Sequence, residues 1–269
     1  MFKMNKFYVQ VAFFLLSIFV YVDNKALAAN PDPKKVKRPN PPKCYHTAEQ
    51  IFGKNEHLLC TNHEETKNAS KLMEEAVAHL KHHAINVNDY SYRDITPEHN
   101  MVFYKKKYKG HVTVYKIKYK VDLDKYESTI HELWDPDIAN LVDDFPVRTK
   151  IARVYNRNLV MIQQRYKDSM FGRVKYLYAL ATKVELSKET TVIAYTSANI
   201  NDHNPSKKQY ENKIIKNANL FKAEIDSEDD IRKGELKKTF IHLAGYYIQK
   251  YDDHVDVTFI ASIDGRVFC

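Results

Sequence analysis

The first residues to examine for chemistry are the histidines, of which the chain has twelve. His79 and His83 stand four residues apart, a spacing that places two imidazoles on one face of a helix, where they could hold a metal ion. A metalloprotease of the H-E-x-x-H type also needs a glutamate as general base, and none lies between these two histidines. The rest of this helix face is polar, so we expect no metal here.

Nucleophilic catalysis has little support in the sequence. A serine hydrolase needs a strained turn such as G-x-S-x-G, which is missing, and the chain has only six glycines. Neither Cys44 nor Cys60 has a convincing histidine partner, and no Cys/His spacing suggests zinc. We expect a protein that is not an enzyme and needs no cofactor. A hydrolase that depends on His131 or His242 is the catalytic alternative.

Polar and aromatic side chains alternate along the predicted strands in a way that suits binding. Nineteen tyrosines and thirteen phenylalanines fit the wall of a cavity for an amphipathic ligand. If their strand faces inward, Arg165 and Gln163 are the anchors for a phosphate group. The alternative is that Arg165 lies on an outer surface, because alternation does not fix which face is inside. The rows that share a face are Leu159/Met161/Gln163/Arg165, Tyr176/Tyr178/Leu180 and Tyr195/Ser197/Asn199.

The elements that must position these residues begin with an amphipathic helix. Thr61 and Glu64 form a capping-box pattern, and apolar residues follow at helical spacing as far as Ala84. Between Tyr90 and Val121 the hydrophobic period changes to two, which is typical of strands with one solvated face.

A second helix and a series of strands follow. Asp124 caps the helix, which ends at Asp135-Pro136, and its Trp134 is expected to be a packing anchor beneath the sheet. A further helix is predicted after Pro205, through Phe221. The predicted strands are 151–155, 159–166, 175–185, 191–200, 238–250 and 255–263. Because the helices stand apart from mostly antiparallel strands, the fold class is α+β.

The N-terminal part of the chain differs in composition from the rest. Residues 1–29 have two early lysines, an apolar run and a small-residue cleavage site, which predict an export signal and a secreted protein. Residues 30–60 form a Pro/Lys-rich linker and leader, and the domain is expected over 61–269. Cys44 and Cys60 would be able to form a disulfide in an oxidising compartment.

The chain is basic, with a formal charge of +8 when histidine is neutral, so it is attracted to anionic surfaces. Its lysines are scattered along strands, as in Lys116, Lys118 and Lys120, and are not gathered on one recognition helix. We therefore expect no nucleic-acid partner. The alternatives for these lysines are a solvated sheet face and a patch that docks on membranes.

Four segments, in order, resemble motifs of START lipid-transfer domains. Trp134-Asp135-Pro136 is similar to the W-D motif, and RVKYLYAL at 173–180 to the R-D-F-V-Y strand. ANINDHNP at 198–205 is similar to the S-V-D-H-P turn, and FIHLAGYYI at 240–248 with VDVTFIASIDG at 255–265 to the closing pair of strands. The resemblance implies a helix-grip START fold, in which a curved, mostly antiparallel sheet encloses one lipid, and a monomer that contacts membranes transiently.

Further segments resemble the fam-a proteins of Plasmodium species that infect rodents. They are HLLCTN at 57–62, LWDPDIANL, VYNxNLVMIQQRY, ANINDH and IDSEDDIRKGxLKKTF. This resemblance implies a protein exported to the host erythrocyte or the parasitophorous vacuole, which transfers a phospholipid, phosphatidylcholine first, between membranes.

The resemblance also implies a set of lipid-binding residues. Phosphatidylcholine carriers of this fold hold the choline in an aromatic cage and the phosphate with a basic residue. Aligned on the W-D motif, His131 stands at their arginine, Gln163 at a tryptophan and His242 at a tyrosine, while Tyr176 keeps its aromatic ring. With the strand rows, the predicted lipid-binding set is Tyr176, Gln163, Arg165, His131, His242, Tyr178 and Tyr195.

The sequence departs from the family at its end. START domains finish with a long amphipathic helix over the mouth of the sheet, and here the chain stops at Cys269, so the lid helix is expected to be missing. An open apolar wall would favour a different function. The alternative to a carrier is an interaction module that docks on an anionic membrane or a host protein without transferring lipid.

Overall fold

The structure is a computed structural model that describes residues 46–88, 90–96, 101–108, 112–137, 148–167 and 171–264, with the side chains of 93–96 left out. All of these residues belong to one compact unit, Tyr45–Phe268. The predicted export signal, the linker as far as Cys44, and Cys269 lie outside the described residues. Among the helices that are described, none is long and apolar enough to cross a bilayer.

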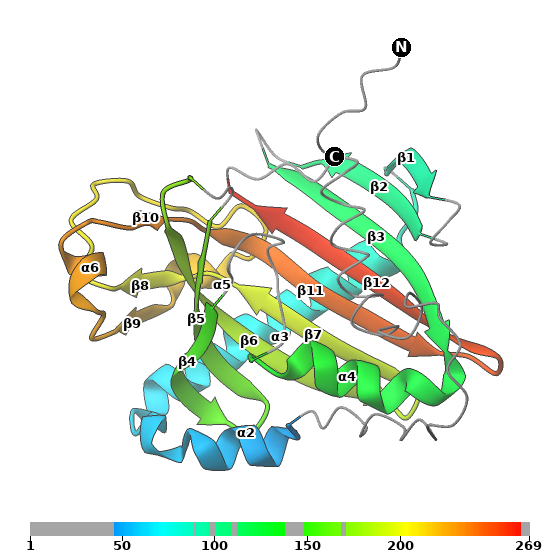
Figure 1. Ribbon diagram of the computed structural model, residues 1–269, viewed down its shortest axis with the longest axis horizontal. Coiled ribbons are helices and arrows are strands. Elements are labelled where there is room, and N and C mark those ends of the chain that lie inside the picture. The colour runs from blue at the N-terminus through cyan, green and yellow to red at the C-terminus, as the bar shows by residue number, and fades with distance from the viewer. Residues whose placement is uncertain are drawn as a thin grey trace, which may run out of the picture. The chain divides into compact units, whose positions relative to one another are not determined.

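A ten-stranded sheet forms the centre of this unit (Figure 1). Consecutive strands along its path pair antiparallel, and β10 (Lys237–Lys238) pairs parallel with β6 beside this path. In spatial order the strands are β1 (Ser91–Thr96), β2 (Met101–Lys107), β3 (Thr113–Asp122), β12 (His254–Ile263), β11 (Ile241–Lys250), β7 (Thr190–Thr196), β6 (Lys175–Ser187), β5 (Leu159–Tyr166) and β4 (Arg148–Asn156).

Helices cover both faces of the sheet. The long helix α3 (His63–Ile85) lies behind it in Figure 1, and α4 (Tyr126–Trp134) lies in front. We call these two sides the α3 face and the α4 face. The α4 face is also covered by α2 (Ala48–Lys54), whose Ile51 shares a core cluster with Trp134. The remaining short elements are η1 (Glu56–Leu58), η3 (Leu123–Lys125), α5 (Asn217–Leu220), α6 (Asp229–Arg232) and the parallel pair β8 (Asn199–Asn201) and β9 (Lys222–Glu224).

Helix α3 confirms the predicted amphipathic pattern. Its N-cap is Asn62, whose side chain accepts from Glu65 N at 3.0 Å, so the helix begins one residue after the start predicted from Thr61. The apolar positions then recur on one face, and all of them are buried against the sheet: Ala69, Leu72, Met73, Ala76, Val77, Leu80 and Ala84.

One glycine allows α3 to approach the sheet closely. Gly245 in β11 has a φ of 143°, and a Cβ placed there would lie 2.0 Å from Ile193 O and 2.6 Å from Leu80 Cδ1. Only glycine avoids both the backbone strain and these contacts. Gly245 therefore sets the distance between the helix and the central strands.

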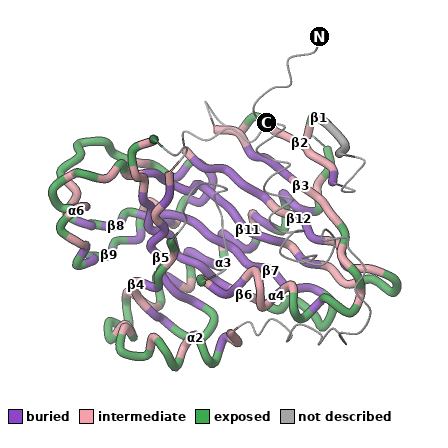
Figure 2. Tube along the Cα trace, in the orientation of Figure 1, coloured by how far each residue is buried: buried purple, intermediate pink, exposed green. Residues whose placement is uncertain are grey.

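Two apolar cores result, one on each face, and most residues of the central strands are buried (Figure 2). Strand β5 shows the division, because Leu159 and Met161 belong to the core under α3 whereas Val160 and Ile162 belong to the core under α4. A strand that is covered on both sides has apolar residues at consecutive positions. This explains the run LVMI at the start of β5.

The helix predicted after Pro205 is wrong for most of its length, since only Asn217–Leu220 are helical. Side chains in this segment capture the backbone N–H groups that a helix would use. Asn204 Oδ1 accepts from Ser206 N at 3.0 Å, and Asn212 Oδ1 accepts from Ile214 N and Ile215 N at 3.0 and 2.8 Å. Such local bonds compete with the helical pattern, and the segment is irregular.

Candidate binding site

The structure divides the predicted lipid-binding residues between the two faces. Gln163 and Arg165 of β5 pair in register with Tyr178 and Tyr176 of β6, and all four share the face covered by α3. Tyr195 belongs to the core on the α4 face. The structure therefore brings Gln163, Arg165, Tyr176 and Tyr178 together beneath α3 and places Tyr195 on the opposite face.

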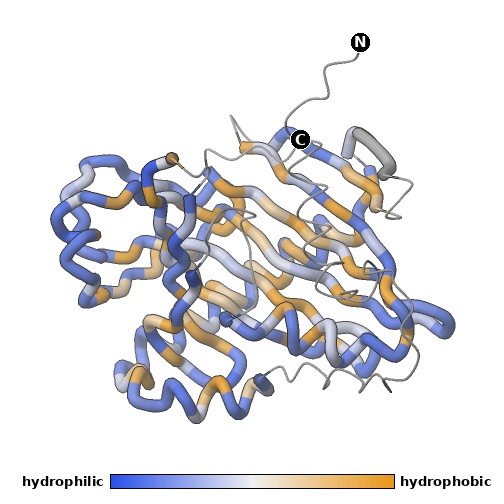
Figure 3. Tube along the Cα trace, viewed as in Figure 1, coloured by the Kyte–Doolittle hydropathy of each residue, from blue (hydrophilic) through white to orange (hydrophobic). Residues whose placement is uncertain are grey.

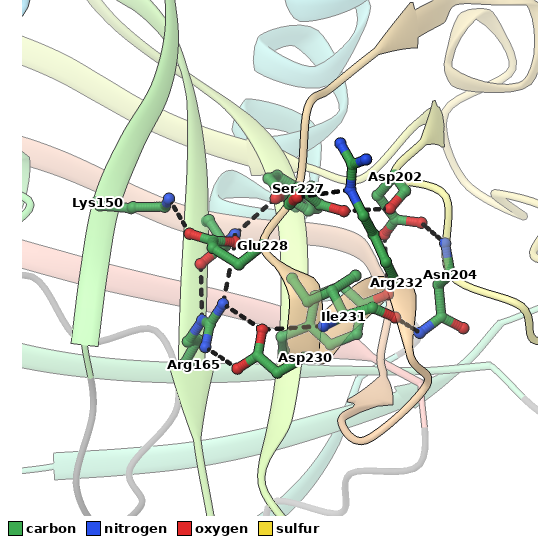
Figure 4. A network of polar contacts seen from close by, with 12 residues as sticks. Lys150, Arg165, Asp202, Asn204, Ser227, Glu228, Asp230, Ile231 and Arg232 are labelled. Carbon is green, nitrogen blue, oxygen red and sulfur yellow. Dashed lines mark hydrogen bonds and ion pairs between the residues drawn. The ribbon is translucent and has the colours of Figure 1, made fainter.

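The polar atoms of Gln163 and Arg165 bind the segment that carries α6. Figure 4 shows Arg165 between Glu228 and Asp230 of this segment. Arg165 Nη1 donates to Asp230 Oδ2 at 2.6 Å and its Nη2 lies 3.0 Å from Glu228 Oε2. Gln163 Nε2 donates to Glu228 Oε2 at 2.8 Å and to the Tyr178 hydroxyl at 2.6 Å. These two side chains hold an acidic segment of the protein itself and not a free anion.

Glu228 is the centre of this network. Burial alone would raise its pKa, but hydrogen bonds from Lys150 and Gln163 lower the pKa to about 2. The segment around α6 is mostly hydrophilic (Figure 3), so these charge-assisted bonds attach its acidic residues to the sheet, while Ile231 packs into the core under α3.

The hydroxyl of Tyr176 also has a hydrogen-bond partner within the protein. Its hydroxyl donates to Asp202 Oδ2 at 2.9 Å, and Lys238 Nζ lies 2.9 Å from the same oxygen. Burial and the neighbouring Asp202 carboxylate raise the pKa of Tyr176. The ring is fully buried beneath α3, where it packs edge-on against Tyr178 with 6.1 Å between ring centroids.

The two histidines of the predicted set lie in different places. His131 is half-buried in the last turn of α4, where its carbonyl accepts from Asp135 N at 2.9 Å. His242 is buried, and its Nδ1 accepts from Lys213 N at 3.4 Å. Burial lowers the pKa of His242, so it is a neutral packing residue beside the 212–213 turn.

Small side chains stand in one row of the α4 face between larger rings, and we call this row the hollow. Residues in register across five strands give the row Tyr115, Ala261, Ala244, Tyr195 and Ala181, from β3 to β6. Alanines thus lie between tyrosines, and their short, fully buried side chains rise less from the sheet than the rings beside them.

Aromatic rings surround this hollow. Tyr246 and Phe259, the next row along, lie with ring centroids 4.9 Å apart, and Tyr119 stands one row further on β3. Burial raises the pKa of Tyr119, Tyr195 and Tyr246, so all three are neutral phenols at physiological pH. Tyr195 donates to Leu133 O at 3.1 Å, whereas the hydroxyls of Tyr119 and Tyr246 have no hydrogen-bond partner among the described residues.

Trp134 lies at the end of α4, against the same face. It is buried in the α4-face core, with 5% of its surface exposed, which confirms the predicted packing role. Its indole Nε1, however, has no hydrogen-bond acceptor within the described part of the chain. Sequence reasoning missed this feature, because composition and spacing show where a tryptophan stands but not whether its N–H is satisfied.

The aspartate of the same motif attaches the N-terminal segment. Asp135 Oδ2 accepts from His46 N at 3.0 Å and lies 2.9 Å from His46 Nδ1, while Lys54 Nζ lies 2.6 Å from His46 Nε2. The ligand atoms of His46, Asp135 and Asp137 lie within 4.8 Å of one another, as the ligands of a metal ion would. The ammonium of Lys54 already occupies one imidazole nitrogen, so we interpret the cluster as a structural contact.

The two helical histidines considered as metal ligands do not converge. His83 is buried with its Nδ1 2.8 Å from the Tyr90 hydroxyl, and His79 faces Glu75 at 3.8 Å. Cys60 is a free, half-buried thiol, and its predicted partner Cys44 lies outside the described residues, so the disulfide stays a prediction.

Comparison with known proteins supports the fold. No protein-family model matches the sequence, and no curated protein matches it. Among solved structures, human StAR-related lipid transfer protein 5 is similar with a TM-score of 0.51 at 9% identity, over 75% of this chain and 84% of that chain. Human STARD10 gives a TM-score of 0.46 at 11% identity, over 72% and 68% of the two chains. The first similarity shows that this chain has the helix-grip START fold that its motifs predict.

Proposed function

We propose that this chain binds one lipid over the α4 face and carries it between membranes without making or breaking a bond. The hollow between Tyr115 and Tyr195, floored by Ala244 and Ala261, is the observation on which the proposal rests. It lies on a START fold, and the solved structure with that fold is named as a lipid transfer protein. On the α3 face the protein's own helix covers most of the sheet, and the groove of about 600 Å³ that remains between α3 and strands β4–β6 is lined largely by polar side chains such as Glu74 and Lys183.

Burial of acyl chains supplies the driving force for such binding. Each methylene that leaves water contributes about 0.8 kcal/mol, so two acyl chains are held chiefly by contact with apolar side chains such as Ile248 and Val257. The headgroup must keep hydrogen bonds, and the hydroxyls of Tyr119 and Tyr246 are without partners among the described residues.

Phosphatidylcholine is the first cargo to test. A trimethylammonium group binds over aromatic faces within about 6 Å of the ring centroid. In the proposed arrangement the rings are those of Tyr119, Tyr246 and Phe259, since Tyr176 and Gln163 point toward α3. This differs from the cage inferred by alignment.

The biological setting belongs to the same proposal. We propose a secreted monomer that is exported by the parasite and touches membranes only while it loads and releases lipid. The N-terminal composition and the net charge of +8 support this part of the proposal.

A transfer assay with a packed variant tests the function. The full chain is mixed with donor vesicles that contain fluorescent phosphatidylcholine and with unlabelled acceptors. We expect Ala244→Leu, which fills the hollow, to lower the transfer rate at least about tenfold, because the space for acyl chains is lost. Glu185→Leu, which introduces the same side chain at an exposed position of β6, is the control and should transfer as the wild type does.

Two further measurements keep the test decisive. The melting temperature of Ala244→Leu shows whether the variant folds, and native mass spectrometry of the wild type shows whether lipid travels with the protein. A folded wild-type chain that neither retains nor transfers phospholipid would contradict the proposal.

A further inference from the structure

Trp134 presents an unsatisfied donor in an apolar place. Within the described residues its indole N–H has no acceptor, and the residue is 5% exposed. A buried donor without a partner costs on the order of 1–3 kcal/mol, so such groups are rare in folded chains and call for a partner.

The indole forms part of the wall of a small pocket between α2, α4 and the sheet. The pocket is narrow, with a free volume of about 10 Å³ that admits one water-sized group, and its other walls include Ile51, Pro136, Ile151 and Ile162. This space admits a single oxygen atom of a ligand, such as a carbonyl oxygen, and no larger group.

The other polar groups that line this pocket among the described residues have protein partners. The Tyr195 hydroxyl donates to Leu133 O at 3.1 Å, and Thr149 Oγ1 accepts from Gln164 Nε2 at 3.1 Å. Trp134 is held firmly, because the next residue, Asp135, is fixed by two bonds from His46. The donor is thus preorganised, and an acceptor from outside the chain is what the pocket lacks.

We infer that the indole N–H of Trp134 donates a hydrogen bond to an ester carbonyl of the bound lipid. The inference rests on the proposed function and names the part of the cargo that is recognised. An ester carbonyl is the acceptor that such a lipid carries among its apolar atoms, whereas a phosphate would lose too much hydration in a pocket walled by isoleucines. The site would therefore select diacyl lipids over dialkyl ether lipids with the same headgroup.

The experiment compares two lipids that differ only in the carbonyls. The full chain, as wild type and as Trp134→Phe, is incubated with vesicles of dioleoyl phosphatidylcholine or of its dioleyl ether analogue, and the lipid retained by the protein is quantified. We expect the wild type to favour the ester lipid about tenfold and the variant to retain both lipids equally. The amount of ether lipid should be the same for both proteins within about twofold.

A second readout needs no substitution. Trp134 is the only tryptophan, so the ¹⁵N-labelled chain gives one indole resonance. We expect the ester lipid to shift this resonance downfield and the ether lipid to leave it unchanged. An indole resonance that responds equally to both lipids, or a variant that keeps the ester preference, overturns the inference about Trp134 alone. A wild-type chain that retains neither lipid overturns the proposed function and this inference with it.

Discussion

Lys116 is a charged residue in an unusual place, since it is fully buried in β3 on the α3 face. Its Nζ donates to Ala84 O and Asn86 O at 3.4 and 2.5 Å and lies 4.1 Å from the ring centroid of Tyr90. A cation at the C-terminal end of a helix satisfies carbonyls that lack intrahelical partners and interacts favourably with the helix dipole. Lys116 therefore joins the end of α3 to the β1–β3 side of the sheet.

Replacing Lys116 should change the alkaline stability profile. Burial lowers the pKa of Lys116 to about 8 in the folded chain, from 10.5 in the unfolded chain. Between these values the unfolded state binds more protons, so this residue makes the free energy of unfolding rise with pH from 8 to 10.5 and has no such effect below pH 8. We expect Lys116→Met to remove that rise, as measured by urea unfolding at pH 7, 9 and 10. Equal pH slopes in the two proteins would contradict the expectation.

His83 should influence the stability of the fold at the acidic end of the pH range. Burial lowers its pKa to about 4 from 6.5, with smaller effects from His82, Lys106 and other nearby cations. The folded chain keeps His83 neutral, so the stability that depends on it is full above pH 6.5 and is lost as the pH falls toward 4. In His83→Gln this loss should be smaller in thermal melts at pH 7, 5.5 and 4.5. His63, which is exposed in the first turn of α3, is the matched control, and His63→Gln should leave the profile as it is.

At the scale of elements, the contact between α3 and β11 depends on Gly245. A methyl group there would meet Ile193 O and Leu80, and the backbone conformation disfavours any other residue. We expect Gly245→Ala to lower the free energy of unfolding by about 3 kcal/mol or more. Gly53→Ala in α2, where a Cβ meets nothing within 4 Å, should be neutral or stabilising by up to about 1 kcal/mol. Similar losses in both variants would mean that close packing is not the cause.

The acidic segment around α6 is a second element whose attachment can be tested. Arg165 contacts both Asp230 and Glu228, and it is partly exposed, so solvent weakens the pairs. We expect Arg165→Leu to cost about 2 kcal/mol and to increase amide hydrogen exchange in residues 226–235 specifically. Arg157→Leu, in the exposed turn between β4 and β5, should change neither measurement.

For the whole molecule, the charge of +8 predicts how the chain meets membranes. Binding to vesicles that contain phosphatidylserine should fall at least about tenfold between 50 and 500 mM NaCl, because salt screens the attraction. A carrier washed off by salt should leave with lipid, and a docking module should leave without it. Sedimentation with lipid analysis of the supernatant separates the two. Salt-independent binding would mean that apolar contacts dominate.

Much of the fold follows from periodicity. The helix at 63–85 and most of the strands were predicted because their apolar residues recur at 3.6 or 2 positions. The conformation of residues 202–216 does not follow from periodicity. It depends on local hydrogen bonds from backbone N–H groups to the side chains of Asn204 and Asn212.

The candidate site was harder to predict than the fold. Alternation showed that Gln163 shares a face with Arg165, and the structure confirms it, yet the side on which α3 packs was not available from the strand pattern. Arg165 is paired with Asp230 and Glu228, which lie more than sixty residues away from it in the sequence. The alanine row depends on register across five strands, which a single sequence does not reveal.

The order of the strands also determines when this chain is able to fold. Strand β3 pairs with β12, as Tyr119 does with Val257, so the partner of β3 is synthesised more than a hundred residues after it. Until β12 leaves the ribosome, β1–β3 form a small sheet with an unpaired edge, and α3 has only part of the surface against which it packs. We expect slow, post-translational folding of high contact order, with the nascent chain dependent on holdase chaperones while it waits.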